Sequence, residues 1–260
     1  MQFSRLLYDI TDRKATITLN RPEKRNALDD VMISELTTAF VQASRDQNVK
    51  AILLKGAGAA FCAGADLEYL SRIASFSLEE NRNDSSKLAN LFRTMYEIRK
   101  PVIAVVHGAA LACGCGLASV CDFVLASKEN ATFGYTEVRI GFIPAVVLIF
   151  LIKRIGEGRA RELVLRGNII NAAEAHAIGL VNNVVAENDL ERSAQKLADE
   201  LCASNSLHAM GLCKEMFSKL HGLNLMDSLD FAANMNAAAR MTPDCKTGIA
   251  AFLNKEKQQW

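Results

Sequence analysis

Two short segments rich in glycine and alanine follow apolar stretches and could present backbone N–H groups to a ligand. Residues 105–122 read VVHGAALACGCGLASVCD, and residues 51–67 read AILLKGAGAAFCAGADL. Where such a turn opens a helix, the first N–H groups have no partner within the helix and suit an oxyanion or a phosphate. If the two turns converge, they aim two donors at an acyl carbonyl oxygen that takes up negative charge during a reaction. For either segment alone, a tight connection chosen only for packing is the alternative.

Glu137 is the acidic residue whose surroundings suggest acid–base chemistry. It lies between the apolar segments FGYT at 133–136 and IGFIP at 140–144. Burial raises the pKa of a carboxyl group towards neutrality, which suits a general acid or base. The alternative is a surface carboxylate that pairs with Arg139 in an extended segment. The apolar flanks favour the catalytic role.

The elements that must position these residues alternate between strands and helices. Apolar runs predict strands at Ala15–Leu19, Ala51–Leu54, Val102–Val106, Phe123–Ala126 and Thr132–Phe133. Helical spacing predicts helices near 29–44, 88–98, 117–121 and 145–155, the first capped by Asp29 or Asp30. After Ala186 only helical patterns follow, at Leu190–Ala203, Leu207–Leu220, Met226–Arg240 and Asp244–Lys255. We therefore expect a mixed α/β body over residues 1–189 and a helical region over residues 190–260.

Composition narrows the class of protein. At 260 residues the chain is near the upper size of a single core, and 30 basic against 29 acidic side chains leave a net charge of +1. Such a balance offers no strong field for nucleic acid or for an anionic membrane. The longest apolar run, residues 142–152, is well short of the roughly 20 residues that span a bilayer. We expect neither partner.

Seven cysteines, an odd number with several in apolar runs, suit reduced buried thiols better than disulfides. The spacing of Cys113, Cys115 and Cys121 does not match the usual zinc pairs, so no metal site is expected. The N-terminus passes straight into strand-like alternation without the features of a secretory signal or a transit peptide. A cytoplasmic location follows as an expectation.

Five motifs in register resemble those of the crotonase, or enoyl-CoA hydratase/isomerase, superfamily. They are LNRPEKRNAL at 19–28, FCAGADL at 61–67, HGAALACGCGLASVCD at 107–122, FGYTEVRIGFIP at 133–144 and GNIINAAEAHAIGLVNNVV at 167–185. The resemblance implies a crotonase-like spiral of repeated ββα units, followed by C-terminal helices that join the chain into homotrimers or homohexamers. The alternative for these helices is packing back onto their own body.

The same resemblance assigns roles to residues. The oxyanion-hole donors fall on the backbone N–H groups of Ala65 and Cys113, where the cysteine replaces the family's usual glycine. Coenzyme A, which enters as part of the substrate rather than as a separate cofactor, maps onto Lys24, Arg25, Ala63, Gly64, Ala65, Asp66, Leu67 and Gly114. Lys24 and Arg25 could equally be solvated loop charges. The acyl pocket is expected from residues 70–87 and 142–148.

The most consequential departure from the family is at Gly116. Hydratases of this family carry one glutamate aligned with Gly116 and another aligned with Glu137, and here only Glu137 is present. A single carboxylate can shuttle the proton of a Δ3–Δ2 double-bond isomerisation. Hydration then lacks its usual second group, which Tyr135, Glu68 or a substrate carboxylate could replace.

Hydration of a 2-enoyl-CoA in fatty-acid or amino-acid catabolism is the favoured expectation. The substrate could be branched and carboxylated, as in methylglutaconyl-type enzymes, and use the room that Gly116 leaves. Enoyl-CoA isomerase is the alternative, and a catalytically impaired acyl-CoA-binding protein is a further one. Thioester hydrolysis and decarboxylation also remain open, because both can run on an oxyanion hole with few side chains.

Overall fold

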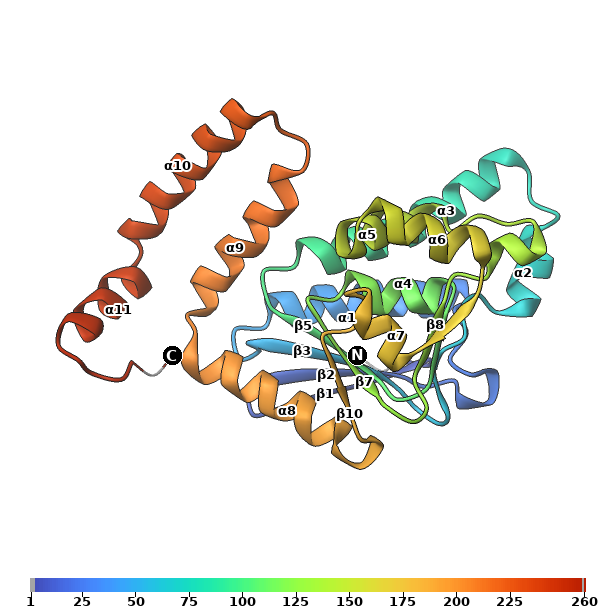
Figure 1. Ribbon diagram of the computed structural model, residues 1–260, viewed down its shortest axis with the longest axis horizontal. Helices are drawn as coiled ribbons and strands as arrows, with labels where there is room; N and C mark the ends of the chain where they lie inside the picture. Colours follow the sequence, from blue (N-terminus) through green and yellow to red (C-terminus); the bar gives the residue numbers. More distant parts are fainter. Residues whose placement is uncertain (1–2, 259) are drawn as a thin grey trace.

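Two β-sheets lie at the centre of the computed structural model, which describes residues 3–258 and 260 (Figure 1). The larger sheet has the order β1 (Leu6–Thr11), β2 (Lys14–Leu19), β3 (Ala51–Gly56), β5 (Val102–Val106), β7 (Phe123–Ser127) and β10 (Asn183–Val185). The smaller one has the order β4 (Ala60–Cys62), β6 (Ala109–Leu111), β8 (Thr132–Gly134) and β9 (Ile169–Asn171). Neighbouring strands run parallel except in the pairs β1–β2 and β8–β9.

Consecutive strands are shared between the sheets. β3, β5 and β7 lie in the larger sheet, and the strand that follows each of them lies in the smaller one before the chain turns into a helix. This repeat is the expected ββα spiral. The helices before β10 are α1 (Asp30–Arg45), α2 (Leu67–Ile73), α3 (Leu78–Glu97), α4 (Cys113–Val120), α5 (Ala145–Ile155), α6 (Glu157–Arg166) and α7 (Ala172–Ala177), with 3₁₀ turns η1 (Pro22–Lys24) and η2 (Glu137–Ile140).

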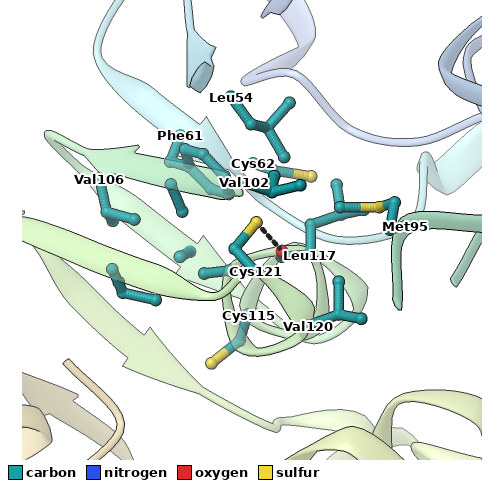
Figure 2. Packing of buried hydrophobic residues seen from close by; sticks show 14 of the residues in the cluster. Leu54, Phe61, Cys62, Met95, Val102, Val106, Cys115, Leu117, Val120 and Cys121 are labelled. Atoms are coloured by element: carbon teal, nitrogen blue, oxygen red, sulfur yellow. Dashed lines mark hydrogen bonds between the residues drawn. The ribbon is translucent and has the colours of Figure 1, made fainter. Parts of the chain in front are cut away.

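The main core lies between the sheets and the helices α1, α3, α4 and α5. Figure 2 shows Leu54, Phe61 and Met95 packed near Leu117 of α4, and the Cys121 thiol donates to the Leu117 carbonyl at 3.1 Å. Because α4 is almost wholly buried, its composition of small and apolar residues is what lets it fit there.

The expected elements are confirmed, with two boundary shifts. The helix expected at 117–121 begins at Cys113, so its glycines belong to the helix rather than to the preceding turn. The helix expected from residue 88 begins at Leu78, where Ser77 and Glu80 form a capping box. Asp29 is the N-cap of α1 and accepts from the Met32 N–H at 2.8 Å.

The predicted division at residue 190 falls inside α8 (Glu187–Ser204). This helix covers the other face of the larger sheet, with Leu190, Ala194 and Ala198 packed against Leu53 and Val105. It therefore belongs to the body. Figure 1 shows that α9 (Leu207–Leu220), α10 (Leu225–Met241) and α11 (Pro243–Leu253), in orange to red, project away from the body. We call these three helices the C-terminal arm.

The C-terminal arm leaves large apolar side chains in contact with solvent. They are Phe217, Leu225, Met226, Leu229, Met241, Ile249, Phe252 and Leu253. After β10 no strand occurs in the described part of the chain, as expected. None of the helices formed by the described residues is long and apolar enough to cross a membrane.

Candidate active site

The two glycine-rich turns meet, as the sequence predicts. Gly64 has a φ of +100°, and a Cβ added to it would lie 3.0 Å from the Cβ of Ala112. A Cβ on Gly114 would lie 2.1 Å from the carbonyl oxygen of Cys62. The end of β4 and the start of α4 are therefore so close that only glycine fits at either position.

The N–H group of Ala65 points away from the segment around Leu28 that lies beside it. The Leu28 N–H donates to the Gly64 carbonyl at 2.7 Å, and the Asp66 N–H donates to the Leu28 carbonyl at 2.9 Å. In a parallel bridge of this kind, the N–H of the residue between those two bonds points the opposite way. Among the described residues, neither the Ala65 nor the Cys113 N–H donates to another residue. Both residues line one cavity of about 570 Å³.

Cys113 is the first residue of α4, so its N–H is one of the groups that a helix leaves unpaired. The strain at this turn lies on Ala112, with φ 49° and ψ −124°, whose N–H donates to the Gly134 carbonyl at 2.7 Å. A cysteine is thus tolerated where the family has glycine. Burial, with a contribution from Glu137, raises the pKa of the Cys113 thiol to about 12. The thiol stays protonated, which favours a role through the backbone.

Arg21 holds the loop that carries Ala65, and sequence reasoning missed it because a lone arginine carries no pattern. Its buried guanidinium pairs with Asp66 at 3.1 Å and with Asp29 at 3.0 Å. The Asp66 carboxylate caps α2 by accepting from the N–H groups of Glu68 and Tyr69. Burial alone would raise the pKa of Asp66, but the Tyr69 N–H and Arg21 hold it below its usual range. Asp66 thus serves the site structurally, because its N–H and carbonyl also form hydrogen bonds, to Leu28 and from Leu70.

Glu137 is buried, at 6% exposure, in the 3₁₀ turn η2. Neither oxygen of its carboxyl group has a hydrogen-bond partner among the described residues, and burial raises its pKa. The surface alternative is therefore wrong: Arg139 is exposed and makes no ion pair with it. The segment that carries Glu137 reaches the cavity through Ile140 and Phe142.

Gly116 leaves no room for a substrate, which corrects the expectation from the sequence. It is fully buried in α4, and a Cβ there would lie 2.3 Å from Cγ1 of Val147 and 3.2 Å from Cε1 of Phe92. Val147 on α5 therefore occupies the volume that a side chain at position 116 would need. The sequence gives no sign of this, because the two residues meet only when α4 packs on α5.

The groups proposed to replace the second glutamate lie elsewhere. Tyr135 is fully buried, with its hydroxyl 2.8 Å from that of Ser119. Glu68 is exposed and pairs with Lys24 at 2.6 Å. Tyr69 and Asp84 line the cavity instead, and the Tyr69 hydroxyl donates to the Asp84 carboxylate. Sequence reasoning missed this pair because the two residues lie on different helices.

The rest of the cavity wall is mainly apolar. Several residues of segment 70–87 line this cavity, and Phe142 is the one member of segment 142–148 on its wall. That the cavity receives the acyl chain stays a prediction. The apolar lining residues are Leu28, Ile33, Leu70, Ile73, Ala74, Leu88, Ile140 and Phe142. An acyl chain held by the two N–H groups would lie among them.

The residues expected to bind coenzyme A lie together beside the start of α2. Lys24 and Arg25 are exposed, and the Arg25 carbonyl accepts the Ala63 N–H at 3.0 Å. Leu67, at 82% exposure, offers an apolar surface next to these charges. Gly114 is buried against Cys62, so it contributes close packing. Coenzyme A binding by this group stays a prediction. No three His, Cys, Asp or Glu side chains of the described residues converge as metal ligands.

Comparisons with known proteins identify the family and the fold. A family model described as enoyl-CoA hydratase/isomerase matches residues 10–260. A relative from Thermus thermophilus is 42% identical over 241 residues, which are 93% of this chain and 94% of that protein. Crotonyl-CoA hydratase of Syntrophomonas wolfei is 32% identical over 259 residues, 99% of this chain and 98% of its own. A crystal structure of an enoyl-CoA hydratase from Shewanella pealeana, 32% identical, superposes with a TM-score of 0.93 over 100% of this chain and 97% of that one. The fold expected from the five motifs is confirmed.

Proposed function

The chain belongs to the enoyl-CoA hydratase/isomerase family of enzymes, and we propose that it adds water to a 2-enoyl-CoA thioester with an uncharged acyl chain. The observation that carries this proposal is Glu137, a buried carboxyl group with both oxygens unpartnered. Its segment adjoins the cavity that holds the unpaired N–H groups of Ala65 and Cys113. The relative named as a crotonyl-CoA hydratase supports hydration over the other family reactions.

The residues divide the reaction as follows. The thioester oxygen accepts hydrogen bonds from the Ala65 and Cys113 N–H groups. A water oxygen bonds to C3 as one of its O–H bonds breaks and that proton leaves to solvent, and the electrons of the double bond move through C2 to the carbonyl oxygen, which forms an enolate. Burial raises the pKa of Glu137, which favours the protonated form, and in that form it gives its proton to C2 as the enolate collapses. Each preorganised donor contributes roughly 3 kcal/mol to the stability of the transition state.

Isomerisation of a 3-enoyl-CoA is the second candidate, and a specific observation favours it. Val147 fills the volume beside Gly116, so no second carboxylate stands at the position where the family's hydratases carry one. Glu137 in its ionised form could then take a proton from C2 and return it to C4 while the same two N–H groups hold the enolate.

The cavity wall supports an uncharged acyl chain. Asp84 is the one charged residue among the described residues that line it. A carboxylated chain of the methylglutaconyl type would meet a like charge there without a cation to balance it, and burying such a charge unpaired is costly. We therefore propose a short or branched hydrocarbon chain, with the coenzyme A phosphates near Lys24 and Arg25.

We also propose that copies of the chain assemble through the C-terminal arm. The exposed apolar side chains of this arm, such as Leu225 and Phe252, lie on helices that contact the body little. Burying apolar surface of this kind between chains removes it from water, which stabilises the assembled state.

The variant Glu137→Gln tests the reaction. It keeps the size of the side chain and removes the titratable carboxyl proton, so hydration of crotonyl-CoA should fall by on the order of 10²- to 10⁴-fold. Glu68→Gln, at an exposed carboxylate that does not line the cavity, is the matched control and should remain active. Hydration is followed as loss of the absorbance of the conjugated thioester. Full turnover in Glu137→Gln, or a wild type that binds butyryl-CoA but does not hydrate crotonyl-CoA, would overturn the proposal.

A further inference from the structure

Tyr69 and Asp84 form a polar pair on the wall of the acyl cavity. Tyr69 comes from α2 and is 7% exposed, Asp84 comes from α3, and the tyrosine hydroxyl donates to the carboxylate. The same cavity is lined by Ala65 and Cys113, the two residues with unpaired N–H groups. The pair therefore faces the space in which an acyl thioester would lie.

No cation neutralises Asp84. Among the described residues, it takes part in no ion pair and accepts a hydrogen bond from Tyr69 alone. Arg72 is the basic residue near the pair, with its guanidinium carbon 5.1 Å from the centre of the Tyr69 ring, but it bonds to Asp30 at 2.8 Å. A carboxylate has about four acceptor positions, so Asp84 keeps the capacity to take a proton.

Tyr69 is rigidly connected to the oxyanion hole. It lies four residues after Ala65, in the first turn of a helix that rises about 1.5 Å per residue. Asp66 accepts the Tyr69 N–H at 3.1 Å and is itself held by Arg21. The network that fixes the Ala65 N–H therefore also fixes the backbone of Tyr69.

We propose that Tyr69 and Asp84 together supply the water-activating function that the single glutamate leaves open, with Tyr69 holding the water and passing its proton to Asp84. This inference rests on the proposed hydration reaction. The hydroxyl of Tyr69 donates to Asp84, so its remaining lone pair is free to accept a hydrogen bond from a water beside C3.

The hydration step consumes one water molecule, and every proton and electron pair in it is accounted for. As the water oxygen bonds to C3, its O–H bond breaks and the proton moves to the Tyr69 oxygen, while the Tyr69 proton moves to Asp84. Glu137 delivers its own proton to C2. Asp84 then releases a proton to solvent, and Glu137 takes one up, so the enzyme is restored and the net change is addition of water. Burial and Asp84 raise the pKa of Tyr69, so it acts as a relay and does not rest as a phenolate.

Tyr69→Phe and Asp84→Asn test the relay with two reactions. Both variants keep the packing of the cavity, and hydration of crotonyl-CoA should fall by on the order of 10²- to 10⁴-fold in each. Isomerisation of 3-hexenoyl-CoA to the 2-enoyl thioester needs only Glu137 and should change less than about threefold, as measured in the same variants. The double variant should be no worse than the poorer single one, because residues that act as a unit are not additive.

Tyr96→Phe is the matched control, because Tyr96 on α3 donates to the Phe217 carbonyl outside this cavity. Equal loss of hydration and isomerisation in Tyr69→Phe would indicate a structural role and overturn the inference. So would unchanged hydration. A wild-type enzyme that isomerises but does not hydrate would overturn the proposed function itself, whereas a hydrating wild type with an unaffected Tyr69→Phe variant overturns only the relay.

Discussion

Cγ1 of Val147 lies 2.3 Å from the point where a Cβ on Gly116 would stand, so one residue fills the space that the other lacks. The Cβ of Val147 lies 2.7 Å from the same point, which is closer than two such atoms approach in real proteins. Gly116 and Val147 therefore form a complementary pair in which a side chain at one position excludes a side chain at the other.

Gly116→Glu alone should destabilise the protein by about 1 to 3 kcal/mol through overpacking, without a gain in hydration. Val147→Ala would not relieve the clash, whereas Val147→Gly combined with Gly116→Glu should accept a second carboxylate. With Tyr69 and Asp84 intact, crotonyl-CoA hydration relative to isomerisation should change little, whereas in a Tyr69→Phe background the added carboxylate should raise this ratio by on the order of 10²-fold or more. Chemical denaturation and the two assays measure this, with Val147→Gly as the control. A single variant Gly116→Glu with wild-type stability would contradict the packing argument.

Cys113→Pro should remove one oxyanion donor while α4 remains, because proline is tolerated at the first position of a helix. We expect kcat to fall by about 10²- to 10³-fold, the effect of losing one such donor. Cys113→Ala keeps the N–H and removes the thiol, so it should retain activity. Circular dichroism establishes that both variants are folded. If Cys113→Ala were inactive and Cys113→Pro active, the thiol rather than the N–H would be the functional group.

The stability of the fold should report the ionisation of Glu137. Burial raises its pKa in the folded state, so the proton is bound more tightly there than in the unfolded chain. The protonated carboxyl contributes stability below the unfolded pKa, and this contribution is lost as pH rises through the folded pKa. The free energy of unfolding of Glu137→Gln, minus that of the wild type, should therefore increase over this range. Denaturation at a series of pH values measures it, and a constant difference would mean that Glu137 titrates normally.

The C-terminal arm should join three or six chains. Light scattering coupled to size-exclusion chromatography should give a mass above that of the 28.4 kDa monomer. Phe252→Glu, at a side chain 82% exposed on α11, should shift the protein towards monomer. Leu165→Glu, at an exposed leucine on α6 outside the arm, is the matched control. A wild type that stays monomeric at every concentration would refute the assembly.

The sequence by itself determined the longer apolar strands and most of the longer helices, the two turns and the acid, whereas short elements such as β4, β6 and α7 were not predicted. Short runs of apolar residues identify β2, β3, β5 and β7, because a buried strand needs apolar side chains at neighbouring positions of the chain. The small residues around Gly64 and Gly114 indicate close backbone approach because no larger residue could replace them. The apolar flanks of Glu137 were enough to predict its burial. These features are local in the chain.

Only the tertiary structure decided which side chains share the cavity. Tyr69 and Asp84 meet because α2 packs beside α3, Val147 closes the space at Gly116 because α5 packs on α4, and Arg21 joins two carboxylates from distant caps. α8 likewise joins the body because its apolar face matches the far side of the larger sheet. Each of these contacts joins residues far apart in sequence, and the packing of the elements sets the distance between them. Neither the spacing of residues along the chain nor its composition predicts that distance.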